Sequence, residues 1–209
     1  MSQASIVIDL FKQWMILADH TKNGPIRPKT SFAGPANRNY QLKNLQYRKF
    51  LQWEDQVGMN VGWTDDAEPS TATRVQRWFF RRNGSNESPI RYGELLALGN
   101  GKPPSFMNYE SRTVGVNLQW HDNPSFEWKL LGGRLGTEIK TGDRLAIYNT
   151  KAKECFIAFD RTVGGDVGWP SSKTWGEQFE DKLGDLAGKA LDRAIQAAVT
   201  ALLTGGAAA

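Results

Sequence analysis

The sequence predicts an all-β domain made of three copies of one four-stranded unit, followed by a helical extension. Three observations favour this fold class. A short motif occurs three times along the 209 residues. Inside each copy, short runs rich in β-branched and aromatic residues alternate with Gly, Pro, Asn and Asp turn signals. After residue 170 the pattern changes to a helical period. We therefore expect the β-domain to cover residues 1–170 and the extension residues 171–209.

The repeated motif reads Phe, aliphatic, any residue, aromatic, acid, then Val-Gly, then Asn or Asp, then Trp. It occurs at residues 50–63, 106–120 and 156–169. Upstream of it, a further similarity aligns residues 23–34, 87–101 and 136–150. A tryptophan heads each copy, at Trp14, Trp78 and Trp128. These landmarks predict internal repeats at about residues 12–63, 76–120 and 126–169.

The number of copies restricts how the strands can close. Twelve short strands must each bury one face, and one four-stranded unit cannot do so alone, so we expect the three copies to pack on one another. A propeller uses units of similar length, but a single-chain propeller needs roughly 4–8 blades. Three copies are too few for that architecture.

The threefold strand count resembles the β-trefoil superfamily, which includes ricin-B-type lectins, fascin-like modules and cytokine-like trefoils. The resemblance covers about residues 12–170. The Gln-x-Trp motif of ricin-B-type lectins appears here as Asn-x-x-Trp in copies one and two and as Asp-x-x-Trp in copy three. The resemblance implies a β-trefoil with lectin-like binding of a glycan or glycoconjugate.

Aromatic and acidic residues recur together in each copy and form the candidate ligand-binding set. An aromatic face can pack on a pyranose ring while Asp, Glu or Asn takes its hydroxyls. The candidates are Trp53, Glu54, Asp55, Asn60, Tyr109, Glu110, Asn117, Phe159, Asp160 and Asp166. The alternative interpretation is structural, with the acids accepting backbone N–H groups in a turn that each copy needs.

The sequence contains few groups suited to catalysis. Its two histidines, His20 and His121, stand in no metal-ligand pattern, and Cys155 is the single cysteine. We expect Cys155 to pack in the core rather than act as a nucleophile. The sequence contains no nucleophile elbow, P-loop or dinucleotide fingerprint. We therefore expect no enzyme activity, no cofactor and no metal site.

Composition narrows the expected partners and compartment. The formal charge is +4, from 26 Lys+Arg against 22 Asp+Glu, which is low for a dedicated nucleic-acid binder. We expect no specific nucleic-acid partner, although basic and aromatic residues are interleaved in residues 38–49. The N-terminal segment lacks the features of a signal peptide, which predicts a cytoplasmic protein or one exported without a cleaved signal.

The extension after Pro170 shows apolar residues at three- and four-residue steps from Phe179 to Leu202, which predicts an amphipathic α-helix. Three interpretations stay open, namely docking on the β-domain, self-association and, last, membrane contact. They correspond to three functional hypotheses. The first is a lectin-like protein with up to three weak sugar sites; the others are an assembly module that uses the helix and a toxin-like protein that targets surfaces.

Overall fold

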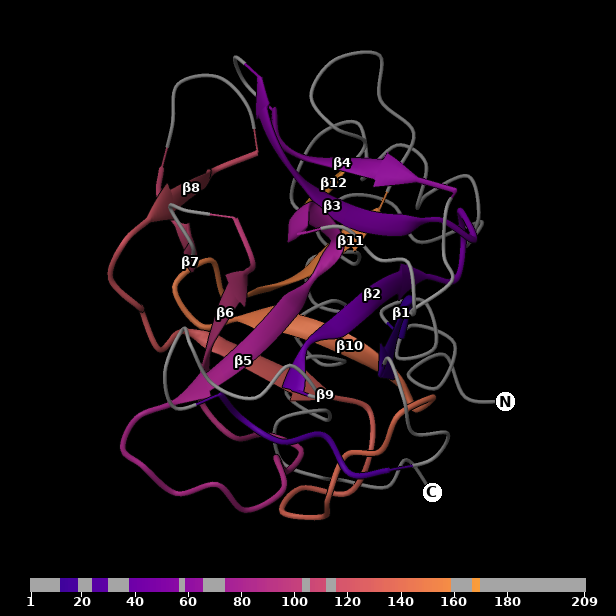
Figure 1. Ribbon diagram of the computed structural model, residues 1–209, viewed down its shortest axis with the longest axis vertical. Helices are drawn as coiled ribbons and strands as arrows, with labels where there is room; N and C mark the ends of the chain where they lie inside the picture. The colour runs from indigo at the N-terminus through magenta and orange to yellow at the C-terminus, as the bar shows by residue number, and fades with distance from the viewer. Residues whose placement is uncertain are drawn as a thin grey trace, which may run out of the picture.

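The computed structural model describes residues 12–18, 24–29, 38–56, 59–65, 74–102, 106–111, 116–158 and 167–169. These residues contain one twelve-stranded antiparallel sheet (Figure 1), so the all-β prediction is confirmed. The strands are β1 (Trp14–Ala18), β2 (Tyr40–Asn44), β3 (Phe50–Gln56), β4 (Met59–Thr64), β5 (Trp78–Arg82), β6 (Leu96–Asn100), β7 (Phe106–Tyr109), β8 (Leu118–His121), β9 (Trp128–Leu131), β10 (Arg144–Asn149), β11 (Glu154–Ala158) and β12 (Val167–Gly168).

Six of these strands close a barrel in the order β1-β2-β5-β6-β9-β10, with β10 returning to β1. Each copy of the repeat supplies two of the six, and the hydrogen-bonded ladders β2–β5, β6–β9 and β10–β1 join neighbouring copies. Barrel closure leaves none of these six strands at an open edge, which removes the edge-pairing hazard of an isolated sheet.

The other six strands lie outside the barrel as the hairpins β3–β4, β7–β8 and β11–β12. They are unequal. Strands β3 and β4 have seven and six residues, whereas β12 has two. Hairpins β3–β4 and β7–β8 occupy the upper part of Figure 1.

This architecture corrects the predicted fold class. The molecule is a closed six-stranded antiparallel barrel with additional strands, and it replaces the predicted lectin-like β-trefoil. Recurrence of a motif shows how many strands the chain contains. Hydrogen bonds between copies decide which strands close the sheet, and the spacing of the motif carries no information about those bonds.

The predicted C-terminal amphipathic helix is not supported either. Residues 171–209 lie outside the described residues, and the residues that are described contain no α-helix. Their one named helical element is a short 3-10 turn at Arg74–Gln76. No helix in the described part of the chain is long and apolar enough to cross a membrane.

Tryptophan pairs build the core in all three copies. Each head tryptophan packs against the closing tryptophan of its own copy, with ring centroids 6.0, 5.9 and 6.2 Å apart. Each head indole N–H also donates to the backbone carbonyl of a hairpin strand. Burial of the indole therefore leaves no unpaired donor. The pairs are Trp14 with Trp63, Trp78 with Trp120, and Trp128 with Trp169.

These indole bonds correct the alignment of the third copy. The accepting carbonyls belong to Leu51, Met107 and Phe156, so Phe156 corresponds to Met107 and not to Phe106. The strand registers agree, because Cys155 pairs with the residue before Asn149 just as Phe106 pairs with the residue before Asn100. The third motif therefore starts at Cys155, one residue earlier than the sequence predicts.

One end of the barrel is closed by a ring of backbone hydrogen bonds. The N–H of Ile26 donates to the C=O of Ile139 (2.9 Å), Ile139 donates to Ile90 (2.9 Å), and Ile90 donates back to Ile26 (2.7 Å). All three side chains are fully buried. We call this the closed end; the opposite end, where turns lead into the hairpins, is the turn end. The β5–β6 and β9–β10 loops reach the closed end at the bottom of Figure 1.

Candidate functional site

The aromatic and acidic candidates of the first two copies point to opposite faces of their hairpins. Trp53 and Glu54 are adjacent on β3, and successive side chains on a strand alternate between faces. Tyr109, at the end of β7, and Glu110, directly after it, are likewise adjacent. Trp53 and Tyr109 both pack against the main core. An aromatic and its neighbouring acid therefore do not form one pocket.

The inward-facing rings are also occupied by other side chains. The ammonium of Lys102 lies 4.8 Å from the centroid of the Trp53 ring, and Trp120 packs against the same residue at 6.2 Å. The Tyr109 ring meets Trp169 edge-on at 5.6 Å. In the third copy Ala158 takes the position of Trp53 and Tyr109, because Ala158 follows Phe156 by the same two residues. The third copy therefore has an alanine, and no aromatic ring, at this position.

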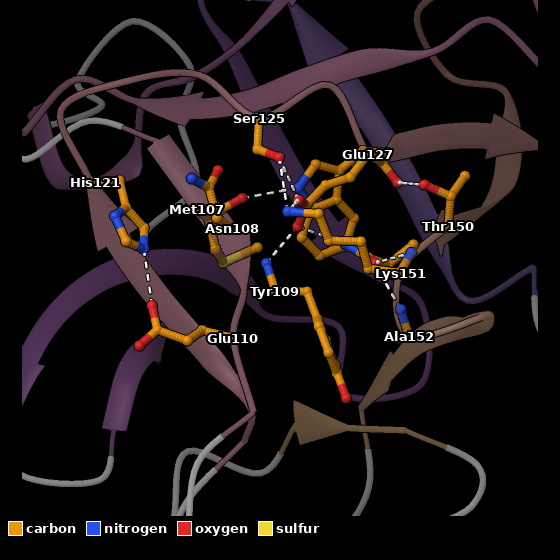
Figure 2. Close-up of polar contacts among 12 residues, drawn as sticks. Met107, Asn108, Tyr109, Glu110, His121, Ser125, Glu127, Thr150, Lys151 and Ala152 are labelled. Atoms are coloured by element: carbon orange, nitrogen blue, oxygen red, sulfur yellow. Dashed lines mark hydrogen bonds and ion pairs between the residues drawn. The ribbon is translucent and has the colours of Figure 1, made fainter.

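The outer face of hairpin β7–β8 carries the polar candidates of the second copy. Glu110 Oε2 lies 3.0 Å from His121 Nε2, with both side chains about half exposed, and Figure 2 shows this pair apart from the buried residues beside it. The N–H of Glu110 donates to the C=O of Asn117 (3.1 Å), which has a φ of 55°. The structure thus brings Glu110 and Asn117 together through their backbones, while the Glu110 carboxylate pairs with His121 rather than with a backbone N–H.

The structure describes the remaining candidates to different extents. Glu54 accepts a hydrogen bond from Gln52 (3.2 Å), and its carboxylate lies over Gly62, where a Cβ atom would be 2.3 Å from it. Asp55 lies in β3 and Asn60 in β4. Phe159, Asp160 and Asp166 lie outside the described residues.

A buried carboxylate that the sequence analysis did not single out lies next to Tyr109. Glu127 is 1% exposed and accepts hydrogen bonds from the Tyr109 N–H, the Ser125 hydroxyl and the Asn149 amide, while Lys151 Nζ lies 2.7 Å from its Oε2 (Figure 2). Burial alone opposes ionisation and is the largest influence on its pKa. The contacts from Lys151, Ser125, Tyr109 and Asn149 outweigh burial and hold the pKa of Glu127 below its ordinary value.

The contacts of Glu127 join one copy to the next, which makes it a structural group. The corresponding residue of the first copy is Gln13, also directly before a head tryptophan, whose Oε1 accepts the N–H of Ala158 (3.1 Å). In the second copy the position holds Arg77. Gln13 and Glu127 thus both accept a backbone N–H of a neighbouring copy, and both carboxylate oxygens of Glu127 are used within the fold.

The closed end carries a second set of chemically similar residues, and these are exposed. The residue after each isoleucine of the ring is cationic, namely Arg27, Arg91 and Lys140. We call these three residues the cation ring. The isoleucines turn inward and are fully buried, whereas the side chains that follow them face solvent. Three equivalent positions thus place three positive charges around one axis.

Contacts with the neighbouring copy hold the two arginines in the same way. Arg27 Nη1 donates to the C=O of Glu87 (3.1 Å), and Arg91 Nη1 donates to the C=O of Gly136 (2.7 Å). Glu87 and Gly136 each stand three residues before the isoleucine of the next copy. A guanidinium has five N–H donors, so one such bond orients it and leaves further donors for a ligand.

Several carboxylates lie at this end, and two of them, Glu94 and Asp143, accept the backbone N–H of a ring residue. Glu87 pairs with Arg38 (2.6 Å) and Glu94 with Arg82. Asp143 accepts the hydroxyl of Tyr92 and the N–H of Lys140, both at 2.9 Å. Among the described residues, the carboxylate nearest to a ring cation is Glu138, 3.9 Å from Arg91. Glu87 and Glu94 pair with cations outside the ring, and the three ring cations outnumber the other two described carboxylates, Glu138 and Asp143, which favours an anion at low ionic strength.

The sequence contained the signal for this ring. The aligned upstream segments read Pro-Ile-Arg, Pro-Ile-Arg and Glu-Ile-Lys, but the sequence analysis used them only to set the repeat. Equivalence in a repeat suggests a shared environment. It does not reveal whether three equivalent residues diverge around the molecule or meet at one axis, which the hydrogen-bond ring shows.

The described residues offer neither a metal-binding cluster nor a reactive thiol. These contain no cluster of three or more His, Cys, Asp or Glu residues that could hold a metal ion. Cys155 is fully buried, and burial raises the pKa of its thiol, with Glu154 adding to the effect. A thiol with a raised pKa is a poor nucleophile at neutral pH.

Comparisons with known proteins add no assignment. No family model matches the chain, and no curated protein matches it in sequence. The predicted description of the chain as a lectin, sugar-binding protein or toxin with an amphipathic helix is therefore corrected to an all-β barrel protein. In the first two copies, the aromatic and its neighbouring acid lie on opposite faces and so share no pocket.

Proposed function

We propose that this protein is a non-enzymatic binding module whose cation ring binds an anionic ligand at the closed end of the barrel. The observation that carries this proposal is the presence of Arg27, Arg91 and Lys140 at equivalent exposed positions around one axis. Guanidinium and ammonium groups donate charge-assisted hydrogen bonds to phosphate, sulfate and carboxylate oxygens. The net charge of +4 agrees in sign with such a ligand.

The absence of a catalytic role is part of the proposal and rests on how the polar groups are used. Glu127 links two copies through its hydrogen bonds, Glu94 pairs with Arg82, and Cys155 is enclosed in the core. A general acid or base must reach a substrate proton. Glycan binding by the hairpins stays a prediction from the sequence, as do self-association through residues 171–209 and a cytoplasmic location.

The test is calorimetric titration of the full chain with inorganic tripolyphosphate at neutral pH and low salt. The double variant Arg27→Gln/Arg91→Gln should bind about 5- to 30-fold more weakly, because each exposed charge contact contributes roughly 0.5–1 kcal/mol and 1.4 kcal/mol is a factor of ten. The matched control is Arg48→Gln/Lys153→Gln, which removes two exposed charges at the turn end and should change affinity less than about threefold.

Ionic strength provides a second readout. Raising the salt concentration from about 0.05 to 0.5 M should weaken binding of the wild-type chain, since screening shortens the reach of exposed charges to a few ångströms. If the wild-type chain does not bind tripolyphosphate, or if both double variants lose affinity equally, the proposal is wrong.

A further inference from the structure

The cation ring has a geometry that narrows the class of anion. Lys140 forms an antiparallel bridge with Pro25, and Arg91 forms one with Glu138. Bridge partners have Cα atoms about 5 Å apart, and two further residues of extended chain add about 7 Å. The Cα atom of Lys140 therefore lies within about 12 Å of those of Arg27 and Arg91. Arginine and lysine side chains are long enough to reach one small ligand across such a span.

The axis itself offers no donor to an anion. Each isoleucine N–H of the ring is used by the carbonyl of another isoleucine, so the backbone does not form the cluster of free N–H groups that holds a single phosphate in other anion sites. Recognition must come from the side chains of the cation ring. A single phosphate placed beside one cation gains little from the other two.

From these two features we infer that the closed end binds one compact molecule carrying three or more phosphate groups, one group facing each member of the cation ring. This inference rests on the proposed function and narrows its ligand class. Arg27 and Arg91 each donate one Nη1 hydrogen bond to the equivalent carbonyl of the next copy, that of Glu87 and that of Gly136. The arrangement fits a ligand whose phosphates are spread around a small ring better than a chain that passes along a stripe.

One acidic residue breaks the threefold equivalence in a useful way. Glu138 stands before its isoleucine, where the other two copies have Pro25 and Pro89. Its carboxylate lies 3.9 Å from Arg91 and is about half exposed. A phosphate group facing Arg91 is repelled by this carboxylate. The variant Glu138→Gln should therefore bind more tightly, a direction of change that loss of folding cannot produce.

The experiment compares myo-inositol hexakisphosphate with myo-inositol monophosphate and inorganic phosphate by calorimetry. We expect one hexakisphosphate per chain, at least about a hundredfold tighter binding than for the monophosphate, and about threefold tighter binding for Glu138→Gln. The single variants Arg27→Gln, Arg91→Gln and Lys140→Gln should weaken binding by similar factors, within about threefold of one another. Thermal unfolding of each variant checks that it is folded.

A second arm distinguishes a free ligand from a lipid headgroup of the same chemistry. Flotation with phosphatidylcholine vesicles, with and without 5% phosphatidylinositol 4,5-bisphosphate, assigns the source: binding that needs the phosphoinositide indicates a headgroup, and its absence indicates a free ligand. If tripolyphosphate binding is lost in Arg27→Gln/Arg91→Gln but hexakisphosphate binds no tighter than the monophosphate, the proposed function stands and this inference fails. The inference also fails if a single ring cation accounts for the whole effect or if two ligands bind per chain.

Discussion

The closed end and the turn end of the barrel treat the three copies differently. At the closed end every copy supplies the same pair, a buried isoleucine followed by an exposed cation. At the turn end the residue before each head tryptophan is different, namely Gln13, Arg77 and Glu127. The three copies are equivalent at the closed end, because the same isoleucine of each copy supplies one N–H and one C=O to a single hydrogen-bond ring. At the turn end, Gln13 and Glu127 accept backbone N–H groups of neighbouring copies through two different side chains.

Equivalent residues of the three copies indicate a shared site only when they lie close to one another. Three alike residues that meet at one axis can act on one ligand together, while three alike residues on separate hairpins act singly. The aromatic-acid pairs belong to the second kind, and Ala158 interrupts their series in the third copy. The cation ring belongs to the first kind.

The largest expected effect is a loss of stability on replacing an isoleucine at the closed end, and it tests whether the three copies are equivalent there. Replacement of Ile26, Ile90 or Ile139 by alanine removes a fully buried side chain from the core, and each should lower the free energy of unfolding by about 2–5 kcal/mol. Because the three sites are equivalent, the three losses should agree within about 1 kcal/mol. Urea unfolding measures them, and one loss much smaller than the other two would contradict the equivalence.

The next largest effect is the difference in stability loss between replacing Glu127 and replacing Gln13 at the turn end. Glu127→Ala leaves the Tyr109 N–H and the Asn149 amide without their acceptor and removes the ion pair with Lys151, and it should cost about 2–4 kcal/mol of unfolding free energy. Gln13→Ala removes a single accepted bond from Ala158 and should cost about 1 kcal/mol. Equal losses in the same urea titrations would show that the two junctions are energetically alike.

The smallest effect is the pH dependence of the stability that the Glu127 carboxylate contributes. Since the pKa of Glu127 is lowered in the folded chain, its carboxylate stabilises the fold at pH values above the pKa of the unfolded chain, about 4.3. The advantage of the wild-type chain over Glu127→Gln should therefore be complete at pH 6–7. It should shrink as the pH falls below about 4, towards the lowered folded-state pKa.

Chemical unfolding of both chains at pH 7, 5, 4 and 3 measures this dependence. Asp122→Asn, at an exposed position after β8, serves as the control for general acid destabilisation. An advantage of wild type over Glu127→Gln that stays constant down to pH 3 contradicts the assigned role of the carboxylate.

Much of the strand content could be predicted from the sequence, and part of the site could not. The head and closing tryptophans mark equivalent places because each copy buries the same indole pair. The sequence predicts the third motif one residue too late, because Phe156 and Phe106 are both phenylalanine. The Phe156 carbonyl accepts a head indole N–H, as the Met107 carbonyl does, so Phe156 is equivalent to Met107. Residue type alone cannot distinguish two aligned positions when both are apolar and buried.

The sequence by itself determined that this protein is all-β, that one unit occurs three times, and that Ile26, Ile90 and Ile139 are followed by cations. These are local properties, since strand propensity, turn residues and repetition depend on neighbours along the chain. The tertiary structure alone decided the rest. Pairing between copies selects the six barrel strands, alternation along β3 and β7 separates Trp53 from Glu54 and Tyr109 from Glu110, and the ring of backbone bonds brings three distant cations to one axis. Contacts between residues far apart in the chain produce each of these features.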